Sequence, residues 1–354
     1  MLLITLAASA QLLRAAAPPV ALQPIPAGTF QMGARTCSGA PFAADELPRH
    51  EVALNAYLVG ETEITITQFC EMLNAQPDWF TVADATDDGT SNNCYGVVRL
   101  NGTSGPAIVW LTTMAPAVTN VADVWAPAAG MRSNHPMVNV TWHGAALFCN
   151  YLSLREGLRL LYATDGWSCA WAFVADADAG YHLPTEAQWE RAAAGTCAGE
   201  AFPWGRFMDH DHCNVYASGD AYESADPAQW PATTPVRSYA ANSYSLYDVI
   251  GNAREWCHDW YDAGYYRRSP AHAPKGPERP VAWLAGGSNR VTRGGGWAYM
   301  PATASLSGRM PQSPVTGAMD LGFRVSRFGD PIPEPAWPAT AITAWCLLAR
   351  RRRG

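Results

Sequence analysis

The sequence predicts an α+β fold with little regular secondary structure. Three short segments combine a helical spacing of apolar residues with helix-capping signals. The strand signals are short, and beyond residue 200 the chain is dominated by glycine, tryptophan, tyrosine and proline. Glycine and proline favour turns. We therefore expect an irregular, loop-rich core with few long elements.

The composition allows a large core. Of the 354 residues, 48% are hydrophobic, which is enough for one big domain or two. The chain has 24 Lys and Arg residues against 31 Asp and Glu residues, for a net charge of −7. This balance argues against nucleic-acid binding, which needs a clustered basic face. An acidic surface suits divalent cations instead.

The first predicted elements are a hairpin and a helix. IPAGTFQMG at residues 25–33 alternates between apolar and polar residues and carries glycines, which favours an edge hairpin. TITQFCEMLN at residues 65–74 places apolar residues on one helical face. Thr65 and Gln68 have the spacing of a capping box, so the helix should begin just after Thr65.

Two further helices are predicted. NVTWHGAALFCNYLS at residues 139–153 is expected to begin as a short strand and to continue as a helix. LPTEAQWERAAAG at residues 183–195 carries the strongest helix signals, because Thr185 and Gln188 have capping-box spacing and Gly195 is a stop signal. Residues 75–135, rich in Asp, Asn, Thr and Gly, are expected to form an inserted surface lobe.

Both ends of the chain look like targeting signals. Residues 1–17 combine an apolar stretch with small residues and are predicted to be a secretory signal peptide, although a buried N-terminal helix is the alternative. At the other end, Pro-Glu-Pro at 333–335 precedes an apolar segment that is shorter than the about 20 residues of a membrane span. Four arginines follow at 350–353.

The order of triplet, apolar segment and basic end over residues 331–354 resembles the PEP-CTERM sorting signal of Gram-negative bacteria. The resemblance implies transient membrane contact through this segment and processing by an exosortase-type enzyme. The mature protein would then be exported to the cell envelope or the extracellular space.

Cysteine usage is compatible with export. The chain has nine cysteines, of which Cys346 lies in the tail. Cys70 and Cys149 fall on apolar helical faces, where a buried thiol that behaves as a small hydrophobe is expected. The others lie in loops or at element ends and are able to pair, but the number of possible pairings is too large to name a bridge.

Several blocks of the chain resemble one known family. They share a fixed order along residues 25–327 and are IPAGTFQMG, VNVTWHGAALFCNYLS, YHLPTEAQWERAAAG, FPWG, TTPVRSYAANSYSLYDVIGNAREWCHDWY, RGGGW and LGFRVSR. The same order occurs in the formylglycine-generating enzyme, or sulfatase-modifying factor, family. The resemblance implies one domain over residues 22–328 with a C-type-lectin-like α+β fold, often bound to calcium.

The resemblance also implies a calcium site in LYDVIGNAREWCHDW at residues 246–260. It maps the family's oxygen ligands onto the side chains of Asp248 and Glu255 and the main-chain carbonyls of Gly251 and Ala253. Calcium takes six to eight oxygen ligands, and each of these residues supplies one. In the alternative interpretation, Asp248 and Glu255 pair with Arg254 or Arg237 in a solvated turn.

A second family calcium site maps onto Asn214 and the carbonyl of Val215, with Asp226 as a further candidate whose spacing leaves it open. Beside it, DHDHC at residues 209–213 has the residue types of a transition-metal cluster. Alternation of such residues in a polar loop is the commoner explanation.

The segment RGGGWAYMPATASLSGRM at residues 293–310 bears on activity. In copper-dependent members of the family, two cysteines in this segment bind Cu(I) and oxidise a substrate cysteine to formylglycine. The matching positions are Tyr299 and Ala304. A phenol is a hard oxygen ligand and a methyl group is no ligand, so no copper is expected.

Two functions from different classes remain. The first is a calcium-stabilised, non-oxidising surface module or scaffold that binds a protein or glycan ligand at the cell envelope through a face rich in Trp and Tyr. The alternative is a formylglycine-generating-type oxidase that acts on a protein cysteine with other residues. The formation of formylglycine in a cysteine peptide distinguishes them.

Overall fold

We describe a computed structural model of the chain. The structure describes residues 20–35, 43–83, 94–100, 107–112, 133–164, 178–197, 199–216, 233–278, 280, 288–300 and 303–329. The expected signal peptide (1–17), the expected sorting signal (331–354) and Asp226 lie outside these residues, so those three expectations stay predictions.

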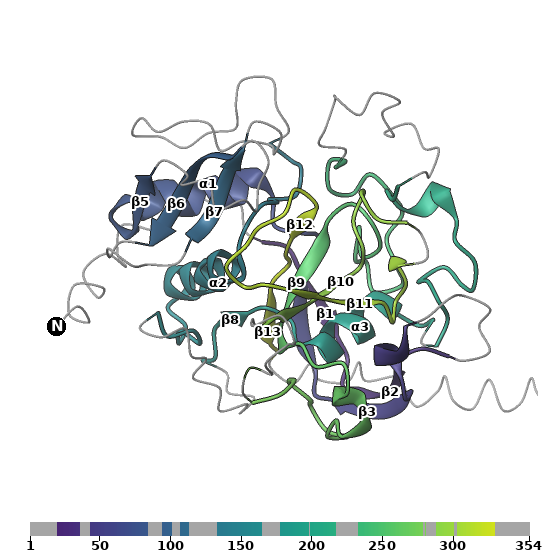
Figure 1. Ribbon diagram of the computed structural model, residues 1–354. Coiled ribbons are helices and arrows are strands. Elements are labelled where there is room, and N and C mark those ends of the chain that lie inside the picture. The colour runs from purple at the N-terminus through teal and green to yellow at the C-terminus, as the bar shows by residue number, and fades with distance from the viewer. Residues whose placement is uncertain are drawn as a thin grey trace, which may run out of the picture.

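In the described part of the chain the strands form four small sheets, shown in Figure 1. The first has the order β1 (Leu22–Ile25), β4 (Tyr57–Gly60), β13 (Ser326–Phe328) and β8 (Tyr181–His182). The second has the order β11 (Arg309–Gln312), β10 (Arg290–Arg293), β9 (Arg254–Trp260) and β12 (Leu321–Gly322). β2 (Gly28–Met32) pairs with β3 (His50–Leu54), and β5 (Phe80–Ala83), β6 (Cys94–Leu100) and β7 (Ala107–Thr112) form the fourth sheet. All strand pairs are antiparallel except β9 with β12.

Within the described residues, three α-helices and four 3₁₀ turns accompany these sheets. The helices are α1 (Ile66–Ala75), α2 (Trp142–Glu156) and α3 (Glu186–Ala194). The 3₁₀ turns are η1 (Ala44–Glu46), η2 (Pro77–Trp79), η3 (His210–His212) and η4 (Tyr265–Arg267). Short helices, small mixed sheets and long connections make this an α+β fold, as the sequence predicts.

The helix starts are confirmed at atomic detail. Thr65 caps α1 and Thr185 caps α3, and each forms the predicted capping box with Gln68 or Gln188. In each case the threonine hydroxyl accepts the N–H of the glutamine, and the glutamine side chain accepts the N–H of the threonine. Gly195 ends α3 with φ of 58°. Local spacing alone decides these starts, because both partners lie within one helical turn.

Two strand expectations are wrong. Residues 25–33 do not form a hairpin, since β1 pairs with β4 and β2 pairs with β3. Pro24 and Pro26 flank the end of β1 without N–H groups, and each strand finds its partner farther along the chain. The expected strand before α2 is also missing, because residues 136–141 make isolated bridges instead.

The described part of the expected surface lobe contains the β5–β7 sheet, which lies beside α1 and α2 in Figure 1. Its strand β7 is held closely to α2. The carbonyl oxygen of Ile108 accepts the N–H of Thr141 at 3.0 Å, and a Cβ on Gly144 would lie 2.2 Å from that oxygen. Only glycine permits this approach.

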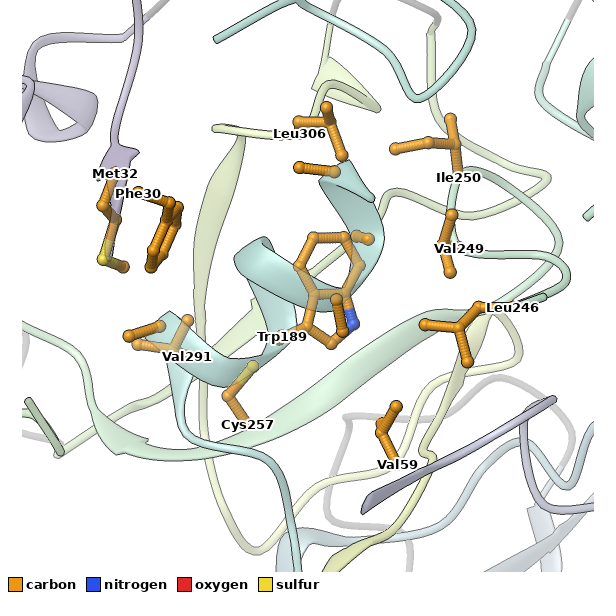
Figure 2. Packing of buried hydrophobic residues seen from close by; sticks show 14 of the residues in the cluster. Phe30, Met32, Val59, Trp189, Leu246, Val249, Ile250, Cys257, Val291 and Leu306 are labelled. Carbon is orange, nitrogen blue, oxygen red and sulfur yellow. The ribbon is translucent and has the colours of Figure 1, made fainter. Parts of the chain in front are cut away.

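Two hydrophobic clusters form the core. One lies between α1, α2 and the first sheet and contains Phe69, Phe148 and Phe323. The other surrounds α3, and Figure 2 shows Trp189 at its centre between Leu306 and Cys257. Trp189 is 1% exposed. The second cluster is the one that supports the candidate site.

Cys70 and Cys149 are buried as expected, and among the described residues Cys70, Cys149, Cys197 and Cys257 are free thiols. Among the residues that the structure describes, no helix is both long and apolar enough to span a membrane.

Candidate functional site

The turn before β9 has an unusual backbone. Asp248, Gly251 and Asn252 all have positive φ, at 55°, 78° and 57°. This region disfavours residues with a Cβ, so the surrounding contacts must impose it. A Cβ on Gly251 would lie 2.3 Å from the carbonyl oxygen of Asn214, which explains the glycine. We call residues 248–253 the cation turn, because two of the expected carbonyl ligands belong to it.

Three buried carboxylates lie close together at this turn, one of them from the turn itself. Glu63, Asp248 and Glu255 are 0%, 6% and 0% exposed. Their charges interact with each other and with that of Arg324, the buried guanidinium beside them. Arg324 is the buried guanidinium among them, so ionisation of all three acids would leave excess negative charge in a site removed from water, where a cation would be the counter-charge.

Glu255 is already held by neighbours. Arg324 donates from Nε to Oε2 and from Nη2 to Oε1, both at 2.7 Å, and Trp189 donates from Nε1 to Oε2 at 2.8 Å. The alternative pairing with Arg254 or Arg237 in a solvated turn is therefore wrong for Glu255, which is buried and pairs with the distant Arg324 instead. Asp248 does contact Arg237, but through the backbone N–H and in a buried position.

Asp248 and Glu63 each keep one oxygen without a partner. Asp248 Oδ2 accepts the backbone N–H of Arg237 at 2.7 Å, and Glu63 Oε1 accepts Nδ2 of Asn252 at 3.1 Å. Among the described residues, neither Asp248 Oδ1 nor Glu63 Oε2 has a hydrogen-bond partner, although both atoms are buried. A buried carboxylate oxygen without a donor is costly, and a cation ligand role would account for both.

The pKa values of Glu63 and Asp248 also indicate that the site lacks positive charge. Burial raises the pKa of Glu63 well above its usual range, and the charges of Asp248 and Glu255 raise it further. Burial also raises the pKa of Asp248, to about 6, against the lowering effect of the Arg237 N–H and of Arg324. A bound cation would favour the ionised forms of both groups.

Glu63 is a site residue that the sequence did not reveal. It lies between β4 and α1, 189 residues before Asn252, and no short motif links it to the cation turn. The residues after β4 read Glu61-Thr62-Glu63, so nothing local distinguishes Glu63 from its acidic neighbour. In the described part of the chain, no three His, Cys, Asp or Glu side chains could hold a metal by themselves, so a cation here also needs the carbonyls of Gly251 and Ala253.

The second expected cation site is only partly described. Asn214 and Val215 are buried, and the carbonyl oxygen of Asn214 accepts the N–H of Asn252 at 2.7 Å, which ties this segment to the cation turn. The transition-metal cluster in residues 209–213 finds no support in the described residues. His212 stacks on Trp204, while Cys213 Sγ lies 3.5 Å from Met208 Sδ.

The segment between β10 and β11, residues 294–308, which we call loop 294–308, carries Tyr299 and Ala304, the two positions onto which the family resemblance maps the copper cysteines. Ala304 is fully buried under Gly295, and a Cβ on Gly295 would lie 2.5 Å from the Ala304 Cβ. Tyr299 is half-buried, with the Arg254 guanidinium 5.4 Å from the centre of its ring. Position 304 therefore points inward, but no sulfur is present at either position.

Both ends of this loop are fixed to α3. Arg293, the residue before the loop, binds Glu190 and also donates to the carbonyls of Leu306 and Ser307 at 2.7 and 2.8 Å. Arg309, the residue after it, makes two 2.7 Å hydrogen bonds to Glu186. Arg293 and Arg309 face each other across β10 and β11. We call these two ion pairs the α3 clamp.

The outer part of the loop is apolar and exposed. Met300 is 58% exposed, and Tyr216 is 48% exposed with its N–H donated to the carbonyl of Tyr299 at 3.0 Å. Beneath them, Arg254 and Asp320 neutralise each other at 3.0 Å. The described part of this face thus offers aromatic and thioether groups without an unpaired charge.

With this geometry in place, a family comparison is decisive. The family described as Sulfatase-modifying factor enzyme 1-like domain matches residues 14–328. The chain belongs to this family. The α+β fold is consistent with that membership.

Relatives within the family differ in their named functions. A formylglycine-generating enzyme of Streptomyces coelicolor is 29% identical over 86% of this chain and 88% of its own length. That of Thermomonospora curvata is also 29% identical, over 87% and 93%. A serine/threonine-protein kinase pkn1 of Chlamydia caviae is 32% identical over 55% of this chain, which spans only 24% of that protein.

Solved structures agree on the fold. Treponema denticola variable protein 1 has a TM-score of 0.55 and 25% identity, covering 87% of this chain and 95% of its own. PvdO from Pseudomonas aeruginosa has a TM-score of 0.60 and 20% identity, covering 88% and 99%. The family scaffold is therefore shared by proteins with different names.

Proposed function

We propose that this domain is a non-oxidising binding module or scaffold for a protein or glycan ligand. The observation that carries the proposal is the chemistry of loop 294–308, where Tyr299 and Ala304 occupy the positions of the copper cysteines. Cu(I) selects soft thiolate ligands, which neither side chain supplies. The scaffold around the loop, including the α3 clamp, is intact, so the loop can still present a surface.

The exposed groups of the loop favour binding. Tyr216, Tyr299 and Met300 offer aromatic and polarizable apolar area, which suits a protein or glycan ligand. A C-type-lectin-like fold, which the family resemblance implies, would present such loops on one face. The proposal concerns this face and assigns no reaction to it.

Incubation with copper, oxygen and a cysteine-containing sulfatase peptide tests the absence of oxidation. We expect no loss of about 18 Da from the peptide by mass spectrometry, since no thiolate pair exists to bind Cu(I). The double variant Tyr299→Cys with Ala304→Cys is the matched comparison and should gain Cu(I) binding. Peptide oxidation by the wild-type protein would overturn the proposal and favour the oxidase.

We further propose that calcium stabilises the domain. The side chains of Asp248, Glu255 and Glu63 and the carbonyls of Gly251 and Ala253 would hold it, and calcium would supply the positive charge that the buried carboxylates lack. The partnerless oxygens of Asp248 and Glu63 support this assignment. A second calcium at Asn214 and Val215, with Asp226 as a possible ligand, belongs to the same proposal.

The variant Glu63→Gln tests the calcium site with two opposite effects. Calcium at a hundredfold excess over its Kd should stabilise the wild-type protein by about 2.7 kcal/mol and raise Tm. Glu63→Gln should lose most of this rise, yet in chelator it should be at least as stable as wild type, because it removes a buried carboxyl group that is costly to ionise. Glu200→Gln is the control, since Glu200 forms an exposed pair with Arg35 and contacts none of the three carboxylates. A wild-type Tm that does not change when calcium is added would count against the site.

The two ends of the chain support export of the mature protein. We propose cleavage after residue 17 and near the Pro-Glu-Pro triplet at 333–335 by an exosortase-type enzyme, with release at the envelope of a Gram-negative bacterium or outside the cell. Intact-mass analysis of the secreted protein tests this, and retention of the arginines at 350–353 would contradict it.

A further inference from the structure

We infer that cation occupancy at the cation turn orders the first half of loop 294–308, the loop that carries Tyr299. The inference rests on the proposed calcium site and deepens the proposed binding function, because it makes the presented surface depend on calcium. It is carried by backbone contacts between two segments that lie more than 40 residues apart in the chain.

Two backbone hydrogen bonds join the cation turn to the start of the loop. Gly251 donates its N–H to the carbonyl of Gly294 at 2.9 Å, and Trp297 donates its N–H to the carbonyl of Asn252 at 3.0 Å. Asn252 lies between Gly251 and Ala253, whose carbonyls would bind the cation. A cation that pulls those two carbonyls toward itself also moves the Gly251 N–H and the Asn252 carbonyl, which are the groups bonded to the loop.

Close packing reinforces this link. Gly294 has φ of 88°, and a Cβ there would lie 3.0 Å from the carbonyl oxygen of Val249 and 3.1 Å from the indole of Trp189. Trp189 in turn donates to Glu255, a carboxylate of the site. The loop therefore begins between the backbone of the cation turn and a side chain that is itself bound to a cation ligand.

The second half of the loop is attached elsewhere. Leu306 donates its N–H to the carbonyl of Ala201 at 2.8 Å, and Arg293 holds the carbonyls of Leu306 and Ser307. None of these contacts involves the cation turn. The structure therefore predicts an asymmetric response, in which calcium changes residues 294–300 and leaves residues 305–308 as they are.

Hydrogen exchange followed by mass spectrometry tests this asymmetry on the full chain, in calcium and in chelator. We expect amides of residues 294–300 to exchange about tenfold more slowly in calcium, as for a local opening that the cation suppresses. Amides of residues 305–308 should not change. Glu63→Gln should remove the calcium response.

The variant Gly294→Ala separates the link from the site. It replaces no cation ligand but strains the junction, so it should keep the calcium-dependent rise in Tm and lose most of the protection of residues 294–300. Gly157→Ala is the matched control: Gly157 also has positive φ, at 69°, but has nothing within 4 Å and lies at the end of α2. It should keep both effects.

The outcomes distinguish the two proposals. A rise in Tm with calcium, but with unchanged or uniformly slowed exchange across both halves of the loop, would overturn the link and leave the cation site standing. If Gly294→Ala lost the rise in Tm as well, Gly294 would belong to the site and the link would again be refuted. No rise in Tm in the wild-type protein would refute the calcium site, and the inference with it.

Discussion

His182 on β8 is a fully buried imidazole whose Nδ1 lies 2.8 Å from the carbonyl oxygen of Leu183. Its ring packs against Phe328, with the ring centres 4.7 Å apart. Burial lowers the pKa of His182 to about 4, and the hydrogen bond to the Leu183 carbonyl only partly opposes this shift. The imidazole is therefore neutral in the folded state at every pH above that value.

This shift predicts acid sensitivity. Between pH 6.5 and 4 the unfolded state binds a proton at His182 that the folded state does not, so stability falls as the pH drops through that window, by about 3 kcal/mol at most. His182→Asn keeps a donor for the Leu183 carbonyl and should flatten this part of the pH profile. Urea unfolding at several pH values, in saturating calcium, measures it. The exposed His272→Asn is the control and should retain the wild-type loss.

At the scale of elements, α3 organises the site with three side chains. Glu186 and Glu190 hold the two arginines at the ends of loop 294–308, and Trp189 donates to Glu255 in the cation cluster. These residues project from nine residues of helix, whose start is set by the Thr185 capping box. The helix therefore positions loop 294–308 and the candidate cation site together.

Breaking the α3 clamp should cost much more than breaking a surface pair. Glu190→Gln removes one of the two carboxylates that pair with the fully buried Arg293, the other being Glu186, and we expect a loss of about 3 kcal/mol in the free energy of unfolding. Glu200→Gln removes an exposed pair with Arg35, at 3.8 Å, and should cost less than about 1 kcal/mol. Urea denaturation at fixed calcium compares them. Equal losses would show that the clamp is not the support of this loop.

At the scale of the whole molecule, Arg324 connects distant parts of the chain. Besides Glu255, its guanidinium donates to the carbonyls of Gly60 and Tyr247 at 3.0 and 2.9 Å. The end of β4, the segment before the cation turn and β9 thus meet at one side chain. The first and second sheets are joined through this buried contact.

Arg324→Lys should therefore destabilise the whole fold. Lysine cannot make the two-point contact with Glu255 or reach all the carbonyls together, and we expect a loss of about 3 kcal/mol. Arg327→Lys is the control, because Arg327 makes a partly exposed pair with Glu156 at 3.3 Å and should cost less than about 1 kcal/mol. Thermal unfolding measures both. A loss below 1 kcal/mol for Arg324→Lys would contradict this role.

The family, the α+β class and the helix starts could all be predicted from the sequence. Helix starts are local, since the Thr65 box closes over three residues. The absence of cysteine at 299 and 304 needs no structure, because it concerns residue identity. Strand pairing was less predictable. The hairpin expected at 25–33 failed because each strand chose a partner by burial and by sheet position, which short alternation does not encode.

The sequence by itself determined which chemical groups the candidate site has, including Asp248 and Glu255 and the missing thiolates of the loop. Only the tertiary structure decided what those groups meet. It brought Glu63 to the cation turn across 189 residues, and it placed Arg324, rather than the neighbouring Arg254, against Glu255. The physical reason is that buried charges must find compensation wherever the fold provides it, and compensation across long sequence separations leaves no local pattern in the chain.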